Sequence, residues 1–185
     1  MIKFRSIKSN SLTKNQIKLI CNLKNQAWKY GLASQLKWFK KYVKIDDFHN
    51  LFFSNNKLIA YTLLRKRTVI EKNKKGLYFL FDTIIIDKNY RGKNLSKEIM
   101  NFNNGIIKKK KMFAFLVCKK NFVKYYKKYD WKILNKSSYI IKDYFGIKEG
   151  LIYNFNKKKK NLIFFYEKIN MQNLRENFLK DGYVV

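Results

Sequence analysis

The sequence has no proline, two cysteines and one histidine among its 185 residues. Cys21 and Cys118 lie far apart in apolar surroundings, which disfavours a disulfide framework and predicts two buried free thiols. No metal-ligand spacing occurs, so we expect no metal cofactor. His49 is the single candidate imidazole base, and no nucleophile motif accompanies it. Ser-His-Asp and Cys-His chemistries are therefore disfavoured.

Long apolar runs are absent as well. No stretch approaches the roughly 20 residues that cross a bilayer, and residues 1–8 lack the apolar core of a secretory signal. These features predict a cytoplasmic protein without a membrane span. A length of 185 residues and an aromatic content of 17% suit one domain with a sizeable core.

Acidic residues are scarce, with 12 Asp and Glu against 42 Lys and Arg, and the formal net charge is +30. Such a charge favours an anionic partner, either nucleic acid or an acidic substrate, cofactor or protein. However, lysine far exceeds arginine, and Asn, Ile, Phe and Tyr are abundant, which is the pattern that an AT-rich coding sequence imposes whatever the function. Nucleic acid therefore stays open as a partner but is not favoured.

Hydrophobic periodicity predicts strands and helices in alternation. A capping box at Thr13 and Gln16 should start the first helix, and Ser34 and Asn121 should cap two others. The expected strands cover 2–7, 48–54, 58–70, 77–86 and 112–118, with helices over 13–27, 34–43, 95–109 and 121–129, an extended segment at 131–134, a hairpin of 150–155 with 162–168, and a terminal helix over 171–180.

The most informative segment runs from Ile84 to Ser96, where an apolar run ends in a short basic loop that opens a helix. The first N–H groups of a helix have no partner within it, and the helix dipole adds partial positive charge there. Arg91 and Lys93 add full charges. The segment therefore predicts an anion site suited to phosphate.

Two blocks in the sequence, Asp82 to Ser96 and Val117 to Trp131, together resemble the GCN5-related N-acetyltransferase superfamily. The block from Asp82 to Ser96 looks like that family's acyl-CoA pyrophosphate loop, with Asn94 and Ser96 at its two small-residue positions. The block from Val117 to Trp131 is similar to the segment in which an aromatic-Tyr pair precedes Gly-Phe or Gly-Trp, with Asp130 in place of the glycine. Asn and Asp tolerate a left-handed backbone better than other non-glycine residues, so Asn94 and Asp130 suit these positions.

The resemblance implies an α/β (α+β) fold, with one domain over 1–185 whose core spans about 2–169 and whose C-terminal extension spans about 170–185. Its central sheet would be mixed, mostly antiparallel and flanked by helices. The implied activity is transfer of an acyl group, most simply acetyl from acetyl-CoA, to an amine by direct attack. Strands near 83–87 and 113–118 would splay to hold the pantetheine. The implied cofactor-binding residues are Ile85, Ile86, Arg91, Gly92, Lys93, Asn94, Leu95, Ser96 and Asn121.

Two residues are candidates for catalysis. Tyr126 falls where the family often places its general acid, and a phenol near the sulfur can protonate the departing thiolate. Its alternative role is a core aromatic. Asp82 is a candidate base or amine-orienting carboxylate, and its alternative is a charge at the edge of the sheet. Such help matters because an alkyl amine with a pKa of about 10 is almost fully protonated at pH 7.

The acceptor should be a small amine that carries phosphate or carboxylate, such as a nucleotide-linked amino sugar or an amino acid derivative, because so basic a protein repels polyamines. Two alternatives stay open. An acidic acyl carrier protein could be the donor, or the chain could be a non-catalytic nucleic-acid or ribosome-associated module on the same fold. The oligomeric state is open too, a homodimer included.

Overall fold

The computed structural model describes residues 2–142, 149–155 and 161–165. The predicted terminal helix, the C-terminal extension and the hairpin tip at 156–160 lie outside these ranges. The described elements are β1 (Ile2–Lys8), α1 (Lys14–Ala27), α2 (Leu32–Tyr42), β2 (Phe48–Ser54), β3 (Lys57–Glu71), β4 (Lys74–Ile86), α3 (Leu95–Lys109), β5 (Ala114–Cys118), α4 (Val123–Lys127), β6 (Lys132–Ile133), β7 (Tyr139–Lys142), β8 (Glu149–Tyr153) and β9 (Leu162–Phe165).

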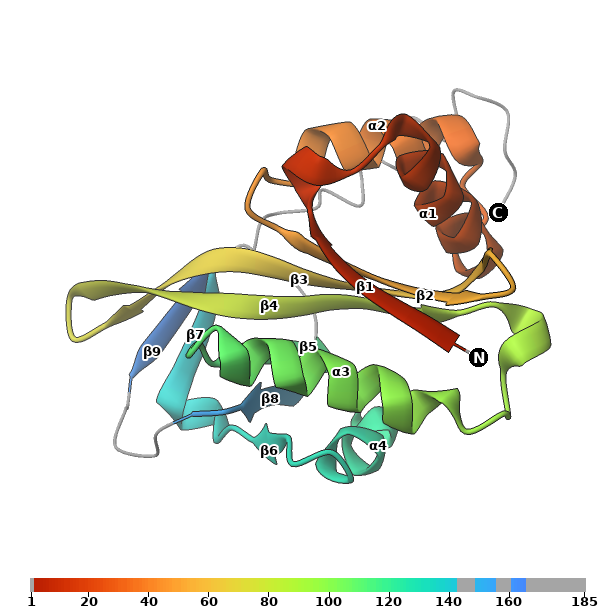
Figure 1. Cartoon of the computed structure of the whole chain (residues 1–185). Coiled ribbons are helices and arrows are strands. Elements are labelled where there is room, and N and C mark those ends of the chain that lie inside the picture. The colour runs from red at the N-terminus through yellow and green to blue at the C-terminus, as the bar shows by residue number, and fades with distance from the viewer. Residues whose placement is uncertain (1, 143–148, 156–160, 166–185) are drawn as a thin grey trace.

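The strands form one sheet in the order β1-β2-β3-β4-β5-β8-β6, and β9 joins both β3 and β7. Two of these pairings are parallel, β4 with β5 and β7 with β9, and the others are antiparallel. Helices α1 and α2 cover one face of the sheet, and α3 and α4 cover the other (Figure 1). The predicted mixed, mostly antiparallel sheet with flanking helices is confirmed. None of the helices in the described ranges is long and apolar enough to cross a bilayer.

The two N-terminal helices begin for different local reasons. Thr13 Oγ1 accepts a hydrogen bond from Gln16 N at 3.2 Å, and Gln16 Oε1 accepts one from Thr13 N at 2.9 Å, so the predicted capping box is confirmed. The prediction of Ser34 as the cap of α2 is wrong. Gly31 is the N-cap, and its φ of 79° turns the chain into a helix that already starts at Leu32.

The predicted C-terminal hairpin is also wrong. β8 pairs with β5 and β6, whereas β9 crosses to β3, where Phe164 lies opposite Val69, and pairs on its other side with β7. β7 was not predicted. Alternating apolar residues predict that a segment is extended, but they do not say which sheet edge will accept it. Here Phe164 is fully buried in a cluster with Tyr78 and Phe115, beside the far end of β3 and β4.

His49 lies in the core between α2 and the sheet. It is fully buried, its Nε2 lies 2.8 Å from Ser9 Oγ, and its Nδ1 lies 2.8 Å from the Tyr61 hydroxyl. Phe39 stacks on its ring at a centroid distance of 5.2 Å. Burial, with a smaller contribution from Lys24, lowers the pKa of His49 to about 3. The imidazole is therefore neutral at pH 7. Cys21 and Cys118 are buried and free, as predicted.

Neutral His49 should make the protein acid-sensitive. Its pKa in the folded state lies below the unfolded value of 6.5, so its contribution to stability is complete above pH 6.5 and is lost as the pH falls towards 3. Between pH 7 and pH 4.5 the wild type should lose about 2 kcal/mol more than His49→Gln. Urea unfolding at both pH values measures this difference. Equal losses in the two proteins would show that His49 does not carry the effect.

Candidate functional site

β4 and β5 run side by side over only a short distance. Their register contains two pairs, Phe79 with Ala114 and Leu80 with Phe115. Beyond Leu80, β4 continues to Ile86 against β3 alone, and β5 continues to Cys118 against β8 alone. Beyond these two pairs the facing edges of the two strands are therefore not paired with each other. This divergence lies where the sequence resemblance predicts splayed strands.

β4 also carries a bulge at the start of this divergence. Leu63 of β3 pairs with Thr83 and Leu64 pairs with Phe81, so Asp82 between them is the extra residue. A bulge takes the backbone of its extra residue out of the ladder and can re-aim the side chain. The Asp82 side chain is only 8% exposed, and its Oδ2 lies 3.4 Å from Arg65 Nη1. Asp82 therefore lies on the edge of β4 that faces away from β3, but its side chain is buried and ion-paired and not a solvated charge.

The loop after β4 is anchored by Asp87. Its carboxylate accepts hydrogen bonds from Asn89 N at 2.9 Å and from Gln26 Nε2 of α1 at 3.3 Å, and lies 3.1 Å from Lys57 Nζ. Gly92 and Asn94 then take positive φ values of 76° and 52°. Asn94 is the N-cap of α3 but makes no side-chain cap hydrogen bond. The first N–H groups of α3 thus keep their capacity to bind an anion.

A cavity of about 400 Å³ opens at this helix start, and its lining residues are Ile86, Tyr90, Gly92, Asn94, Leu95, Ser96, Lys97 and Tyr129. Five of these were predicted from the sequence, whereas Tyr90, Lys97 and Tyr129 were not. Tyr129 could have been found, because it lies one helical turn after Tyr125.

The other predicted loop residues lie beside the cavity or apart from it. Arg91 is exposed, and its Nε donates to Ile86 O at 3.2 Å. Lys93 Nζ lies 5.1 Å from the centre of the Tyr90 ring. Ile85 is buried in the cluster beneath α1 and α2, so only its backbone can serve the site. Asn121 is exposed in the turn before α4 and is absent from the lining; the prediction that it caps α4 is wrong, since Phe122 is the N-cap.

α4 brings the second block against this loop. Burial raises the pKa of Tyr125, and a hydrogen bond with Ser96 partly offsets the rise, so the two blocks meet through these side chains. Asp130 has a φ of 64°, which is the left-handed conformation expected where a glycine is usual. The chain then turns Trp131 into the core, where its Nε1 donates to Asn104 Oδ1 of α3 at 3.2 Å.

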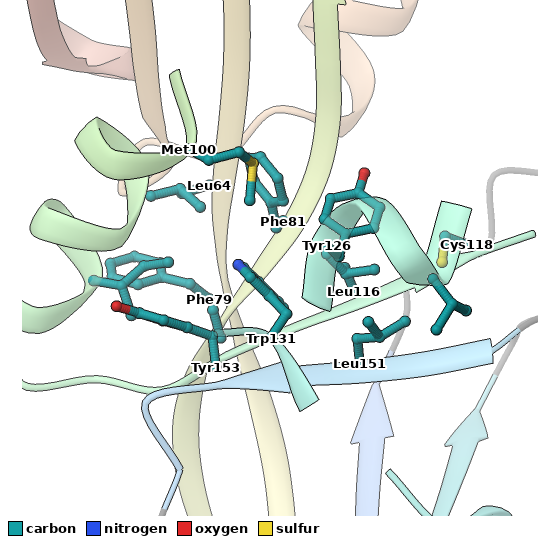
Figure 2. Packing of buried hydrophobic residues seen from close by; sticks show 13 residues of the cluster. Leu64, Phe79, Phe81, Met100, Leu116, Cys118, Tyr126, Trp131, Leu151 and Tyr153 are labelled. Atoms are coloured by element: carbon teal, nitrogen blue, oxygen red, sulfur yellow. The ribbon is translucent and has the colours of Figure 1, made fainter. Parts of the chain in front are cut away.

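Tyr126 packs on the α3 and α4 face of the sheet. Its ring lies 6.4 Å from that of Phe81 and 6.1 Å from that of Trp131. Figure 2 shows its hydroxyl pointing away from Trp131 and Leu151. Burial, with smaller contributions from Tyr125 and Cys118, raises the pKa of Tyr126, so the phenol stays protonated at neutral pH. The ring thus has the core role weighed above, while its hydroxyl retains a proton to donate.

The two candidate catalytic residues reach the β4 and β5 divergence from opposite faces of the sheet. Phe81, which contacts Tyr126, and Asp82, which contacts Arg65, are consecutive in β4. A group held between the two strands would have the phenol on one side and the carboxylate on the other. The described residues contain no group of three His, Cys, Asp or Glu that could hold a metal ion.

The protein is similar to known proteins in its structure but not detectably in its sequence. The sequence matches no protein-family model and no curated protein. An acyl-CoA N-acyltransferase from Pseudomonas aeruginosa is similar with a TM-score of 0.62 at 13% identity, over 82% of this chain and 99% of that one. Escherichia coli ElaA gives 0.59 at 12% identity, over 82% and 99%. PaiA N-acetyltransferase from Thermoplasma acidophilum, in complex with coenzyme A, gives 0.53 at 15%, over 84% and 99%. The chain therefore has the fold of the GCN5-related N-acetyltransferases.

Proposed function

We propose that the protein is an acyl-CoA-dependent N-acyltransferase that uses acetyl-CoA and a small anionic amine. The observation that carries this proposal is the junction of two features: strands β4 and β5 that diverge after Leu80, and an uncapped start of α3 beside the cavity. The first offers backbone groups to an extended pantetheine, and the second offers N–H groups to a pyrophosphate. A cytoplasmic location follows from such a donor.

Each chemical step has a candidate group in the chain. The edge of β4 beyond Leu80, which β5 no longer pairs, can offer backbone N–H groups to the oxyanion that forms on the acyl carbon. The Asp82 carboxylate can orient the acceptor amine and take its proton as the new C–N bond forms. On the other face, the Tyr126 hydroxyl can give its proton to the sulfur as the C–S bond breaks. These roles need no metal ion.

Binding of acetyl-CoA tests the proposal, and Ser96 offers a charge-specific variant. Ser96→Asp should weaken acetyl-CoA binding by roughly 10–100-fold, because it puts a carboxylate at the start of α3 where the phosphates would bind. The same carboxylate favours the helix dipole, so the fold should persist. Ser96→Asn has nearly the same shape without the charge and should lose only a few-fold. Isothermal titration calorimetry measures all three proteins.

Three results would contradict the proposal or modify it. Equal affinities of Ser96→Asp and Ser96→Asn for acetyl-CoA would show that the phosphates do not bind at the start of α3. No acetyl-CoA binding by the wild type, together with salt-sensitive RNA binding, would support the non-catalytic alternative. Turnover with an acylated carrier protein but not with acetyl-CoA would change the donor and retain the activity.

A further inference from the structure

Lys24 of α1 is a buried lysine on the face of the sheet that carries Asp82. The residue is 5% exposed. Its Nζ lies 3.1 Å from the ring centre of Trp38, which is itself buried, and 5.9 Å from that of Trp28, which is 39% exposed. The ammonium is thus placed between the core and a tryptophan at the surface. No carboxylate of the described residues lies within ion-pairing distance of it.

The neighbouring buried charges are already paired with one another. Asp47 lies 2.7 Å from Arg67, and Asp82 lies 3.4 Å from Arg65. Among the residues that the structure describes, this face therefore buries three cations against two carboxylates, and Lys24 is the surplus. A buried charge without a counterion destabilises the protein. When a ligand supplies the counterion, the low dielectric of the interior strengthens the attraction between the two charges.

We propose that Lys24 binds a carboxylate of the acceptor, which makes the substrate class amines that carry a carboxylate, as amino acids do. The surplus of one positive charge decides between the two anions that suit a basic protein. A carboxylate neutralises that surplus, whereas a phosphate dianion would leave a net negative charge among buried groups. This inference rests on the proposed function, because Asp82 is the group expected to orient the acceptor amine.

The proposal predicts a dependence on pH. The titratable and charged groups around the Lys24 ammonium are Cys21 of its own helix, His49 of β2, Arg65 of β3 and Asp82 of β4. Burial lowers the pKa of Lys24 to about 8, Asp82 and Cys21 oppose the shift, and Arg65 adds to it. The ammonium therefore carries its charge at pH 7 and loses it above pH 8. Preference for a carboxylate should fall over the same range.

The test compares L-amino acids with their own carboxamides as acceptors, with acetyl-CoA as the donor and thiol release as the readout. For the acceptors that are used, kcat/KM of the acid relative to its amide should fall at least about tenfold in Lys24→Met, which keeps the contact with Trp38 but removes the charge. Lys18→Met, an exposed lysine of the same helix, should leave the ratio unchanged. Lys24→Arg should retain the preference and remove its decline above pH 8, since arginine stays charged.

Binding data separate failure of this inference from failure of the proposed function. If the wild type binds acetyl-CoA but neither binds nor acetylates any acid better than its amide, Lys24 does not select a carboxylate. An unchanged ratio in Lys24→Met overturns the inference as well. If the wild type binds no acetyl-CoA, the proposed function itself fails. Thermal stabilisation of the CoA complex by each acid and amide supplies the comparison even where turnover is absent.

Discussion

Replacing Asp47 by asparagine should destabilise the protein by about 3–5 kcal/mol, because it removes the buried carboxylate that pairs with buried Arg67. Asp47 is fully buried, and its two oxygens accept hydrogen bonds from Arg67 at 2.7 and 3.2 Å. They also accept the backbone N–H groups of Lys44 and Lys66 at 2.9 and 3.0 Å, and Arg65 Nε lies 3.8 Å away. One carboxylate thus joins the end of α2 to β3. Urea unfolding monitored by tryptophan fluorescence measures the loss.

Asp46 is the matched control, because it is adjacent in the chain and differs in burial. Its side chain is 51% exposed and lies 3.8 Å from Lys8 and 3.7 Å from Lys66. Asp46→Asn should leave stability nearly unchanged, since exposed pairs contribute little. If Asp47→Asn does not fold, the double variant with Arg67→Met should recover part of the stability by removing one uncompensated cation. Equal effects of the Asp46 and Asp47 variants would contradict the buried network.

Much of the fold could be predicted because its signals are local. The capping box at Thr13, the periodic helix after Leu95 and the left-handed positions at Asn94 and Asp130 each depend on a few neighbouring residues. The partner of β9 could not be predicted in this way. It pairs with β3, more than 90 residues earlier in the chain, and no short pattern specifies such a pairing.

In the candidate site too, the residues in local sequence patterns could be predicted and those that depend on packing could not. The loop at the start of α3 was visible because glycine, asparagine and basic residues follow an apolar strand directly. Lys24 and Asp47 were not visible in the sequence. Lys24 is one of many lysines, and in a periodic helix it looks like part of a solvated face. Only the packing of α1 and α2 on the sheet shows that these two are buried. Asp82 was predicted from the sequence, whereas Lys24, the proposed carboxylate-binding residue, required the structure.

Replacing Tyr126 by phenylalanine should lower kcat by roughly 10²–10⁴-fold if its hydroxyl is the general acid, while acetyl-CoA affinity stays the same. The ring contacts with Phe81 and Trp131 persist in the variant, so its thermal stability should also be unchanged. Burial raises the pKa of Tyr126, which keeps the proton available across the neutral range. Steady-state kinetics with a saturating acceptor, together with calorimetric titration of acetyl-CoA, measure the two effects separately.

Tyr125→Phe is the control that makes this result specific. Tyr125 precedes Tyr126 in α4, but its hydroxyl hydrogen-bonds Ser96 at the start of α3. Its loss should therefore weaken acetyl-CoA binding a few-fold and spare kcat, the reverse of the Tyr126 variant. An acid role also predicts that a donor with a more acidic thiol, which leaves without protonation, will be less sensitive to Tyr126→Phe. If kcat of Tyr126→Phe equals that of the wild type for both donors, Tyr126 is a core aromatic and the thiolate takes its proton elsewhere.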